Sequence, residues 1–276
     1  MPALYVVPTP LGNLGDLSAR SLEVLRGVGW IAAEDTRHST PLLKHFGIGA
    51  RLLPAHEHNE NAAAAKIVEK LAAGEAVALI SDAGTPGISD PGARVVAAVR
   101  AAGHRIVPLP GPCAAVTALS AAGLADQRFL FVGFLSAKAG QRRQAIAELA
   151  KVQAALVFYE APHRVVDTVA DLAAELGQRT LVVARELSKL FESIHACPLA
   201  DAAEWLRADA NRQKGEFVLI VSGAPGDADA GDSERILGLL LDEGLPVKQA
   251  AKLAAAIGGG SKNALYDLAL SRRGER

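Results

Sequence analysis

The chain has 276 residues, of which 50% are hydrophobic and 4% aromatic, and its formal net charge is −1. This length allows two domains of ordinary size, and the balanced charge excludes a surface basic enough throughout to bind nucleic acid. Two distant cysteines, Cys113 and Cys197, argue against a disulfide framework or a structural zinc site, and no signal peptide or ~20-residue apolar run is present, so we expect a soluble cytoplasmic protein.

Short strand patterns alternate with longer amphipathic helical patterns over the first part of the chain. Continuous apolar runs are typical of strands buried on both faces, and the strand–helix–strand order favours a parallel sheet. We therefore predict a doubly wound, parallel-sheet α/β domain over residues 1–113. Its expected strands are 4–7, 30–33, 76–80 and 105–109, and its expected helices are 18–28, 60–73 and 91–102.

The alternation changes after Pro110-Gly-Pro112. A helix over 113–122 leads into a second α/β domain, 114–224, for which we predict a mixed sheet because two late strands flank a single helix near 199–209. Its expected strands are 129–132, 155–158, 181–184, 191–195 and 217–221.

The end of the chain has a different pattern. Residues 225–232 are rich in Gly, Asp and Ala after a proline, which is typical of a flexible linker. Three short helical patterns, 234–241, 247–256 and 263–270, then predict a small C-terminal helical extension over residues 233–276. Its basic bias suits either RNA docking or the covering of an apolar patch on the main body.

Ligands of open parallel sheets bind outside the carboxyl ends of the strands. Three loops at those ends, 8–16, 82–92 and 110–112, are dense in Gly and Pro, which fix unusual backbone shapes and let a ligand approach main-chain groups. In the longest loop, Asp90 and Pro91 have the pattern of an N-cap and a first helical residue. The alternative is a tight connection in which Asp82 caps only its own turn. Three such loops at one edge predict a small-molecule site.

Several well-known motifs are absent. The sequence has no GxxxxGK[ST], no GxGxxG after a strand, no GxSxG and no HExxH, which disfavours P-loop nucleotidases, dinucleotide enzymes, serine hydrolases and zincins. His56, Glu57 and His58 have the residue types of a metal cluster, but neighbouring ligands on one short loop rarely converge without a third element. We therefore expect no metal, and assign this segment to substrate contact or to a capping loop.

Nine segments in series resemble motifs of the tetrapyrrole-methylase superfamily. Within it they are most similar to the branch that methylates small-subunit ribosomal RNA, and they span residues from about 4 to 222. Singly these motifs are weak, but nine in order are highly specific. The departures are local, at Val7-Pro8, Phe191 and Ala196-Cys-Pro198, and bear on substrate contacts. The segments are 8–16, 32–39, 56–60, 81–92, 108–112, 129–135, 158–165, 184–192 and 214–221.

The resemblance implies two α/β domains with a cleft for S-adenosylmethionine between them, and a homodimer. The implied activity is 2′-O-methylation of a cytidine ribose in the decoding region of bacterial 16S rRNA, with the small ribosomal subunit as partner. Two alternatives stay open: a methyltransferase of the same superfamily that acts on a tetrapyrrole-like small molecule, and a non-catalytic RNA- or nucleotide-binding module. By motif match the cofactor residues are Pro10, Asp82, Gly84, Thr85, Ile88, Ser89, Pro112 and Ala115.

Methyl transfer to a ribose hydroxyl is an in-line displacement to which a general base adds ~10²–10⁴-fold. Asp35 and Glu160 each follow a buried strand and are the first candidates for this base, ahead of Glu57, His56 and His58. The alternative for the first two is an ion pair with a neighbouring arginine. Candidate RNA contacts are Arg37, His56, Arg142, Arg143, Arg164, Lys189 and Lys214, although the Arg142-Arg143 pair equally suits a solvated helix start.

Overall fold

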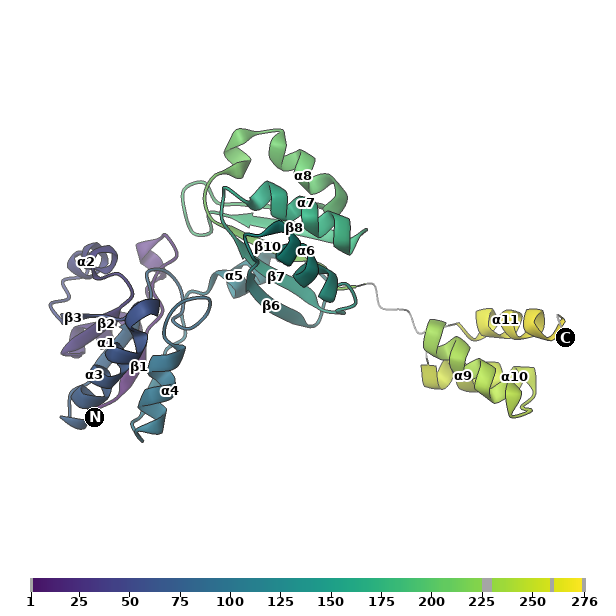
Figure 1. The fold of residues 1–276 in the computed structure, drawn as a ribbon, viewed down its shortest axis with the longest axis horizontal. Helices are drawn as coiled ribbons and strands as arrows, with labels where there is room; N and C mark the ends of the chain where they lie inside the picture. Colours follow the sequence, from purple (N-terminus) through teal and green to yellow (C-terminus); the bar gives the residue numbers. More distant parts are fainter. Residues whose placement is uncertain (1, 225–229, 259–260, 275–276) are drawn as a thin grey trace. The chain divides into compact units, whose positions relative to one another are not determined.

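The structure is a computed structural model that describes residues 2–224, 230–258 and 261–274. It divides into two compact units, one made of residues 1–150 and 155–222 and the other of residues 151–154 and 223–276 (Figure 1). The first unit contains both sheets, and the second contains three helices. No helix of the described ranges has both the length and the apolar character that crossing a membrane requires.

The first sheet has five parallel strands in the order β3-β2-β4-β1-β5, which confirms the predicted parallel α/β architecture. Its strands are β1 (Leu4–Val6), β2 (Trp30–Ala33), β3 (Arg51–Pro54), β4 (Val77–Ile80) and β5 (Ile106–Pro108). Its helices are α1 (Ala19–Gly27), α2 (Thr36–His45), α3 (Glu60–Ala72) and α4 (Ala93–Ala101), with 3₁₀ turns at Leu14–Asp16 and Glu57–Asn59.

Both faces of this sheet are buried, as the continuous apolar strands predict. Alternate strand residues point to opposite faces, so Ala32 and Ile31 belong to different cores. Residues of α3 and α4 complete one core, and residues of α1 and α2 complete the other. The carboxyl ends of the strands, and the loops that follow them, therefore lie together at one edge of a rigid layer.

The start of α4 differs from the prediction. The helix begins at Ala93 with Gly92 as its N-cap, so Asp90 and Pro91 are not the cap and the first helical residue. A different carboxylate does the capping: Glu60 Oε1 accepts the amides of Gly92 at 2.9 Å and Arg94 at 2.8 Å. A buried side chain from α3 satisfies these amides, so the cap of α4 does not involve Asp90.

The second sheet has the order β6-β7-β10-β8-β9. The pair β6–β7 is parallel and the other pairs are antiparallel, which confirms the predicted mixed sheet. Its strands are β6 (Phe129–Phe134), β7 (Ala155–Glu160), β8 (Thr180–Arg185), β9 (Ser193–Pro198) and β10 (Phe217–Val221). Its helices are α5 (Ala114–Ala122), α6 (Ala139–Glu148), α7 (Val165–Leu176) and α8 (Leu199–Arg207), with a 3₁₀ turn at Ala210–Gln213.

Helix α5 packs its small residues Ala115 and Ala118 against β7, β8 and β10, and α7 lies between α6 and α8. Strand β9 begins at Ser193, not at the predicted Phe191. The amide of Glu192 bonds to the carbonyl of Lys189, and the Glu192 carboxylate accepts the amide of Ser188 at 2.6 Å. These bonds close a turn before β9, so Phe191 does not join the sheet.

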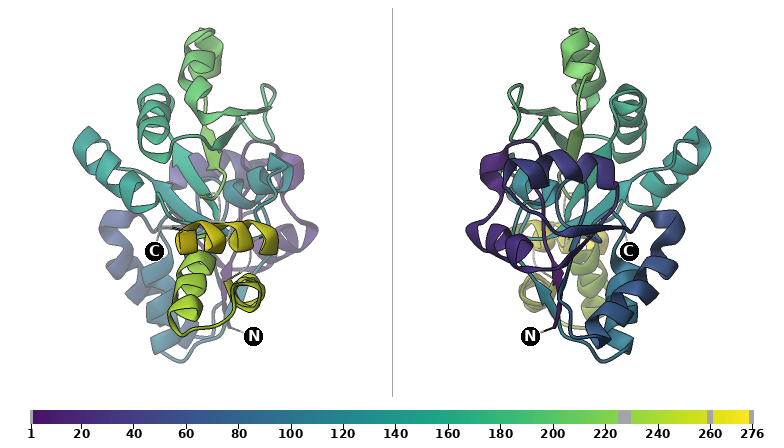
Figure 2. Two further views of the ribbon diagram at one scale, coloured as in Figure 1. Left: turned by 90° about the vertical axis from the view of Figure 1, so that its right-hand side faces the viewer. Right: turned by 90° about the vertical axis from the view of Figure 1, so that its left-hand side faces the viewer.

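The second unit contains α9 (Ala230–Asp242), α10 (Val247–Gly258) and α11 (Lys262–Gly274), as the three helical patterns predict. The helices share an apolar core that includes Leu237, Ala250 and Leu265, and α11 packs against both α10 and α9 (Figure 2). Of the predicted linker 225–232, residues 225–229 lie outside the described residues. Its last three residues belong to α9, which begins at Ala230 rather than after the linker.

Candidate active site

Hydrogen bonds join the loops at the carboxyl edge of the first sheet. Thr9 and Gly84 exchange two backbone bonds of 2.9 Å, and the Thr9 hydroxyl donates to the carbonyl of Ser81 at 3.0 Å. The Thr85 hydroxyl donates to the carbonyl of Pro112 at 2.8 Å. The loops after β1, β4 and β5 are therefore joined to one another, and these hydrogen bonds restrict the conformations that their backbones can adopt.

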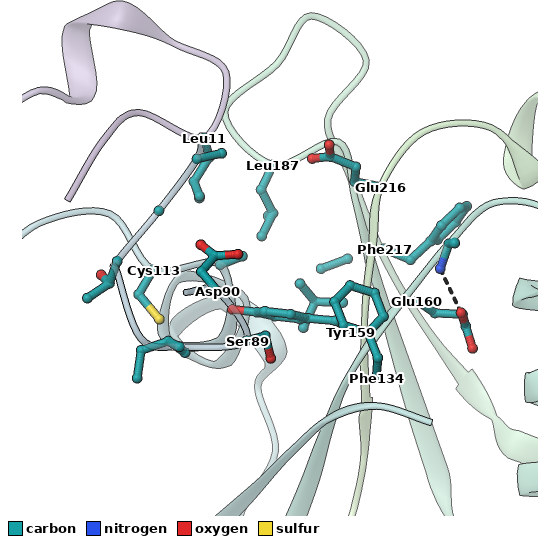
Figure 3. Close-up of a pocket in the computed structure, with 18 of the residues that line it drawn as sticks. Leu11, Ser89, Asp90, Cys113, Phe134, Tyr159, Glu160, Leu187, Glu216 and Phe217 are labelled. Carbon is teal, nitrogen blue, oxygen red and sulfur yellow. Dashed lines mark hydrogen bonds between the residues drawn. The ribbon is translucent and has the colours of Figure 1, made fainter. Parts of the chain in front are cut away.

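A cavity of about 290 Å³, the first cavity, lies between this edge and the second sheet. Its volume is near the lower end of the range of ~300–1,000 Å³ typical of small-ligand sites. The walls are mostly apolar, and the polar side chains are few (Figure 3). The lining residues are Leu11, Ala83, Gly84, Thr85, Ile88, Ser89, Asp90, Cys113, Ala114, Phe134, Tyr159, Glu160, Ala161, Pro162, Ala184, Leu187, Glu216, Phe217 and Val218.

Asp90 is the carboxylate that faces the middle of this cavity (Figure 3). Burial and the nearby charge of Glu34 raise its pKa to about 6. Burial and the charge of Asp82 also raise the pKa of Glu34. A cation in the first cavity would relieve this accumulation of negative charge and favour the ionised form of Asp90.

Tyr159 forms part of the opposite wall. Its ring lies edge-on to Phe131 and Phe134, with centroid distances of 5.0 Å and 5.6 Å. Its hydroxyl accepts the amide of Ala115 at 3.1 Å, which ties β7 to the start of α5, and burial raises the pKa of this phenol. Tyr159 therefore stays neutral and presents a fixed aromatic surface to the cavity.

The loop 82–92 meets β6 at Gly133, where the strand has a bulge. Gly133 has φ +75°, and a Cβ there would lie 2.9 Å from the Ser89 hydroxyl oxygen. Ser89 itself has φ +60°, a backbone conformation that residues other than glycine rarely adopt. A glycine in β6 is thus what allows the loop to approach the second sheet so closely.

The predicted cofactor residues fall into three groups. Gly84, Thr85, Ile88 and Ser89 line the first cavity. Pro112 and Ala115 support it through the bonds to Thr85 and Tyr159 described above. The remaining two, Pro10 and Asp82, line a neighbouring cavity instead.

This neighbour, the second cavity, has a volume of about 310 Å³. It shares three lining residues with the first cavity, namely Leu11, Ala83 and Glu216. The two cavities therefore adjoin, with Glu216 on the wall of each. The other residues around the second cavity are Pro10, Gly12, Leu14, His38, Ser39, Leu42, Asp82 and Lys189.

Asp35 caps the start of α2 and pairs with Arg37. Its carboxylate accepts the Arg37 amide at 2.8 Å and the guanidinium at 2.8 Å, and these bonds lower its pKa to about 2. The amide of Asp35 donates to Asp82 Oδ1 at 3.1 Å. Asp82 thus joins the loop after β2 to the loop after β4, a contact beyond its own turn.

Glu160 is buried and its carboxylate is fully engaged. Its Oε1 accepts the amide of Ala161 at 2.7 Å and the guanidinium of Arg164 at 2.6 Å, and its Oε2 accepts the Thr168 hydroxyl at 2.5 Å. In Figure 3 the carboxylate lies at the edge of the first cavity and points away from Asp90. This geometry corresponds to the ion-pair alternative for Glu160.

The predicted RNA contacts differ in their accessibility. The Arg142 side chain is 7% exposed and donates to Asp171 at 2.7 Å, so it is neither at the surface nor a solvated helix start. Arg143 donates to the same carboxylate at 2.8 Å but is 59% exposed. Arg37, His56 and Lys214 are exposed.

The other two candidates, Arg164 and Lys189, are partly buried in ion pairs. Sequence reasoning did not single out Asp90, Tyr159 or Glu216 as site residues. All three lie in segments that match motifs of the family, namely 81–92, 158–165 and 214–221, and this shared location is the sequence signal for them. Within the ranges that the structure describes, no three His, Cys, Asp or Glu side chains are grouped to hold a metal ion.

Comparison with known proteins agrees with this architecture. Residues 3–203 match the family model described as tetrapyrrole (corrin/porphyrin) methylases, and residues 227–273 match the one described as the RsmI C-terminal HTH domain. Among solved structures, uroporphyrin-III-C-methyltransferase from Thermus thermophilus has a TM-score of 0.58 at 20% identity, covering 89% of this chain and 100% of that one. The methyltransferase CobJ has a TM-score of 0.61 at 20% identity, covering 81% and 95%.

Two relatives are much more similar in sequence. The protein named ribosomal RNA small subunit methyltransferase I from Escherichia coli O157:H7 is 52% identical over 274 residues, covering 98% of this chain and 96% of its own. The protein of the same name from Pseudomonas aeruginosa is 52% identical over 277 residues, covering 99% and 98%. The chain therefore belongs to the tetrapyrrole (corrin/porphyrin) methylase family, in the branch that holds the proteins named ribosomal RNA small subunit methyltransferase I.

Proposed function

We propose that this protein transfers a methyl group from S-adenosylmethionine to the 2′-hydroxyl of a cytidine in the decoding region of bacterial 16S rRNA. The observation that carries the proposal is similarity over the whole chain, at 52% identity, to proteins named for methylating the RNA of the small ribosomal subunit. The match includes the C-terminal helices as well as both sheets, since it covers 98% and 99% of this chain. The structures of methyltransferases named for porphyrin substrates support only the common fold, at 20% identity or less.

The first cavity has the chemistry that S-adenosylmethionine requires. This donor supplies an electrophilic methyl group on a sulfonium sulfur and carries a second positive charge on its α-ammonium. Asp90 offers the matching negative charge, and Tyr159, Leu187 and Ile88 offer apolar surface for an adenine ring. Gly84, with φ +84°, leaves main-chain groups uncovered where a Cβ would lie 3.4 Å from Leu11. The residues present therefore fit the cofactor.

The protein's part in catalysis is then to position the reactants and exclude water. Because positive charge is lost as the sulfonium reacts, an apolar pocket favours the reaction over aqueous solution. Loops of fixed shape would hold the donor and the acceptor hydroxyl in line, which removes much of the entropic cost of bringing two reactants together.

Asp35 and Glu160 were the first candidates for the proton acceptor, and their surroundings suit another role better. Asp35 has a pKa of about 2, so it attracts a proton weakly, and both oxygens of Glu160 already accept hydrogen bonds from Ala161, Arg164 and Thr168. We therefore propose that both are positioning residues: Asp35 orders the start of α2, and Glu160 orders the start of α7.

The C-terminal unit is proposed to dock on ribosomal RNA. The family model that matches residues 227–273 is that of an HTH domain. Lys248 and Lys252 are exposed on α10, and Lys262 is exposed at the start of α11. Exposed lysines bind phosphates without reading sequence, so they would add affinity rather than site selection. Among the earlier candidates, Arg37, Arg143 and Lys214 keep enough exposure to contact phosphates as well.

We also propose that two chains associate as a homodimer. Strand β6 is at the edge of its sheet, and Phe129, Leu130 and Phe134 are exposed on it, with Val116 exposed on α5. Exposed apolar side chains on an edge strand favour association. Light scattering on the protein and on Phe129→Glu tests this: a dimer that becomes a monomer is expected, and a monomeric starting protein would contradict it.

A methyl-transfer assay tests the proposed function directly. Isolated 30S subunits, naked 16S rRNA and uroporphyrinogen are each offered with radiolabelled S-adenosylmethionine, and the labelled RNA is mapped for 2′-O-methyl groups. We expect label at one cytidine of the decoding region and none in the porphyrinogen. Label in the porphyrinogen alone would contradict the proposal, as would the absence of any cofactor binding by calorimetry at millimolar concentration.

A further inference from the structure

The second cavity adjoins the first but has a different lining. Pro10, Leu14 and Leu42 give it apolar walls, while His38, Ser39 and Asp82 add hydrogen-bonding groups. A nucleoside has the same division, because its base has two apolar faces and a polar edge. Since Leu11, Ala83 and Glu216 also line the first cavity, a group bound in the second would lie next to the cofactor.

Ser39 gives independent evidence of a ligand. The residue is 3% exposed, lines the second cavity, and its hydroxyl has no hydrogen-bond partner within the described part of the chain. An unpaired hydroxyl out of contact with water costs about 1–3 kcal/mol, so such groups are rare in native proteins without a reason. Because Ser39 lines the second cavity, a turn of its side chain would bring the hydroxyl to a polar group of a ligand bound there.

Lys189 and Glu216 form a fixed side of the same cavity. A Cβ on Gly12 would lie 2.3 Å from Lys189 Cγ, so the lysine side chain passes directly over this glycine and would have to move for a larger residue. Lys189 Nζ then pairs with Glu216 at 2.9 Å and with Glu186 at 3.1 Å. The Glu216 side chain is 76% exposed, so this carboxylate is held in place by the lysine but remains open to an incoming group.

We propose that the second cavity receives the acceptor nucleoside, turned out of the RNA strand, and that Glu216 accepts the proton of its 2′-hydroxyl. This inference rests on the proposed function and names the acceptor site for it. Enzymes that modify a nucleotide commonly extrude it into a pocket, which costs least in single-stranded segments. Ser39 and Asp82 would then meet the polar edge of the base, and a carboxylate there suits the amino group of a cytosine.

The step balances with the groups present. The 2′-oxygen forms a bond to the methyl carbon, and the bond from that carbon to the sulfonium sulfur breaks with its electron pair left on sulfur. The hydroxyl proton passes to the Glu216 carboxylate and from there to water. Glu216 suits this role because it lines both cavities, and its carboxylate is held by Lys189 at 2.9 Å yet is 76% exposed to an incoming group.

Two variants test the proposal with 30S subunits from cells that lack the enzyme. Glu216→Gln keeps the shape but removes the base, so we expect kcat to fall by ~10²–10⁴-fold. The acid limb of the kcat profile, measured at saturating S-adenosylmethionine at each pH, should disappear in the same variant, while the Kd for S-adenosylmethionine measured by calorimetry stays within about threefold. The matched control is Glu204→Gln, on the exposed face of α8, which should keep the original kcat.

Ser39→Ala tests the cavity separately. Because the hydroxyl has no partner, its loss should leave resistance to urea equal or higher, yet kcat/KM for 30S subunits should fall by about 5–100-fold. Ser120→Ala, at an exposed site on α5, is the control. If the unaltered protein methylates no 30S subunit, the proposed function itself fails. If it does, and Glu216→Gln or Ser39→Ala performs like the unaltered protein, this inference alone is overturned.

Discussion

Two buried carboxylates of the second α/β region, Asp171 in α7 and Glu160 at the end of β7, differ from Asp90 of the first cavity in the groups that surround them. Asp171 accepts bonds from Arg142 and Arg143, and Glu160 accepts bonds from Arg164 and Thr168. Asp90, by contrast, is partly buried among other carboxylates with no arginine or lysine among the causes of its pKa shift. The first region uses buried charge to hold helices, and the second leaves charge uncompensated where a cationic cofactor is expected.

The largest effect is expected from breaking the buried pair. Arg142→Ala would leave Asp171 with only its exposed partner, which should lower the free energy of unfolding by about 3–5 kcal/mol. Arg143→Ala, which removes the 59% exposed partner of the same carboxylate, should cost less than about 1 kcal/mol. Urea unfolding of both variants gives the comparison. Equal losses would show that burial does not distinguish these two arginines.

The cavity carboxylate should affect cofactor binding. Asp90→Asn removes the negative charge that faces the first cavity, and the Kd for S-adenosylmethionine should rise by roughly 10–100-fold, the equivalent of about 1.5–3 kcal/mol for a bond to a charged group. Titration calorimetry measures this, with Asp201→Asn on the exposed face of α8 as the control. Unchanged affinity in a folded variant would place the cofactor's positive charge elsewhere.

The same residue predicts a dependence on pH. The pKa of Asp90 is raised to about 6 in the folded protein, so its native form holds a proton that the unfolded chain loses near pH 4. Its contribution to stability is therefore present at low pH and is lost as the pH rises through about 6. Asp90→Asn should be more resistant to urea than the unaltered protein at pH 8, with the difference shrinking at pH 4.

Cofactor binding should show the opposite trend. A cationic ligand favours ionised Asp90, so affinity should fall as the pH drops below about 6, by up to about tenfold per pH unit. Calorimetry between pH 5 and pH 8 checks this, and the dependence should be absent in Asp90→Asn. An identical pH profile in both proteins would assign the effect to another group.

The smallest effect concerns the cap of α4. Glu60→Ala should lower the free energy of unfolding by about 0.5–2 kcal/mol, because the amides of Gly92 and Arg94 lose their acceptor. Glu60→Gln keeps an acceptor oxygen and should recover most of this loss. A full loss in the glutamine variant would mean that charge, and not hydrogen bonding, is what the helix start requires.

Local patterns predicted most of the elements, and the omissions have identifiable reasons. β3 is a short edge strand that ends in a proline, and α2 contains Pro41, so neither has a strong pattern. In α6 the buried residues are Arg142 and Ile146, and an arginine at a buried position hides the apolar face. Helix α7 has buried Val165, Val169, Leu172 and Leu176 at helical spacing, a signal that the prediction overlooked.

The sequence by itself determined the parallel sheet, the mixed sheet, the three Gly/Pro-dense loops and the family. Each of these depends on residues close together in the chain, or on motifs in a fixed order. Only the tertiary structure decided which carboxylate caps a helix, which is held in an ion pair and which faces the cavity. Glu60 caps the helix that Asp90 was expected to cap, because residues 32 and 34 positions apart meet only in the folded chain. For Glu160 the sequence left the base and the ion pair with Arg164 both open, and the folded chain buries the carboxylate against Arg164 and Thr168. The charge state of a side chain depends on these distant neighbours and on burial, neither of which is written in local spacing.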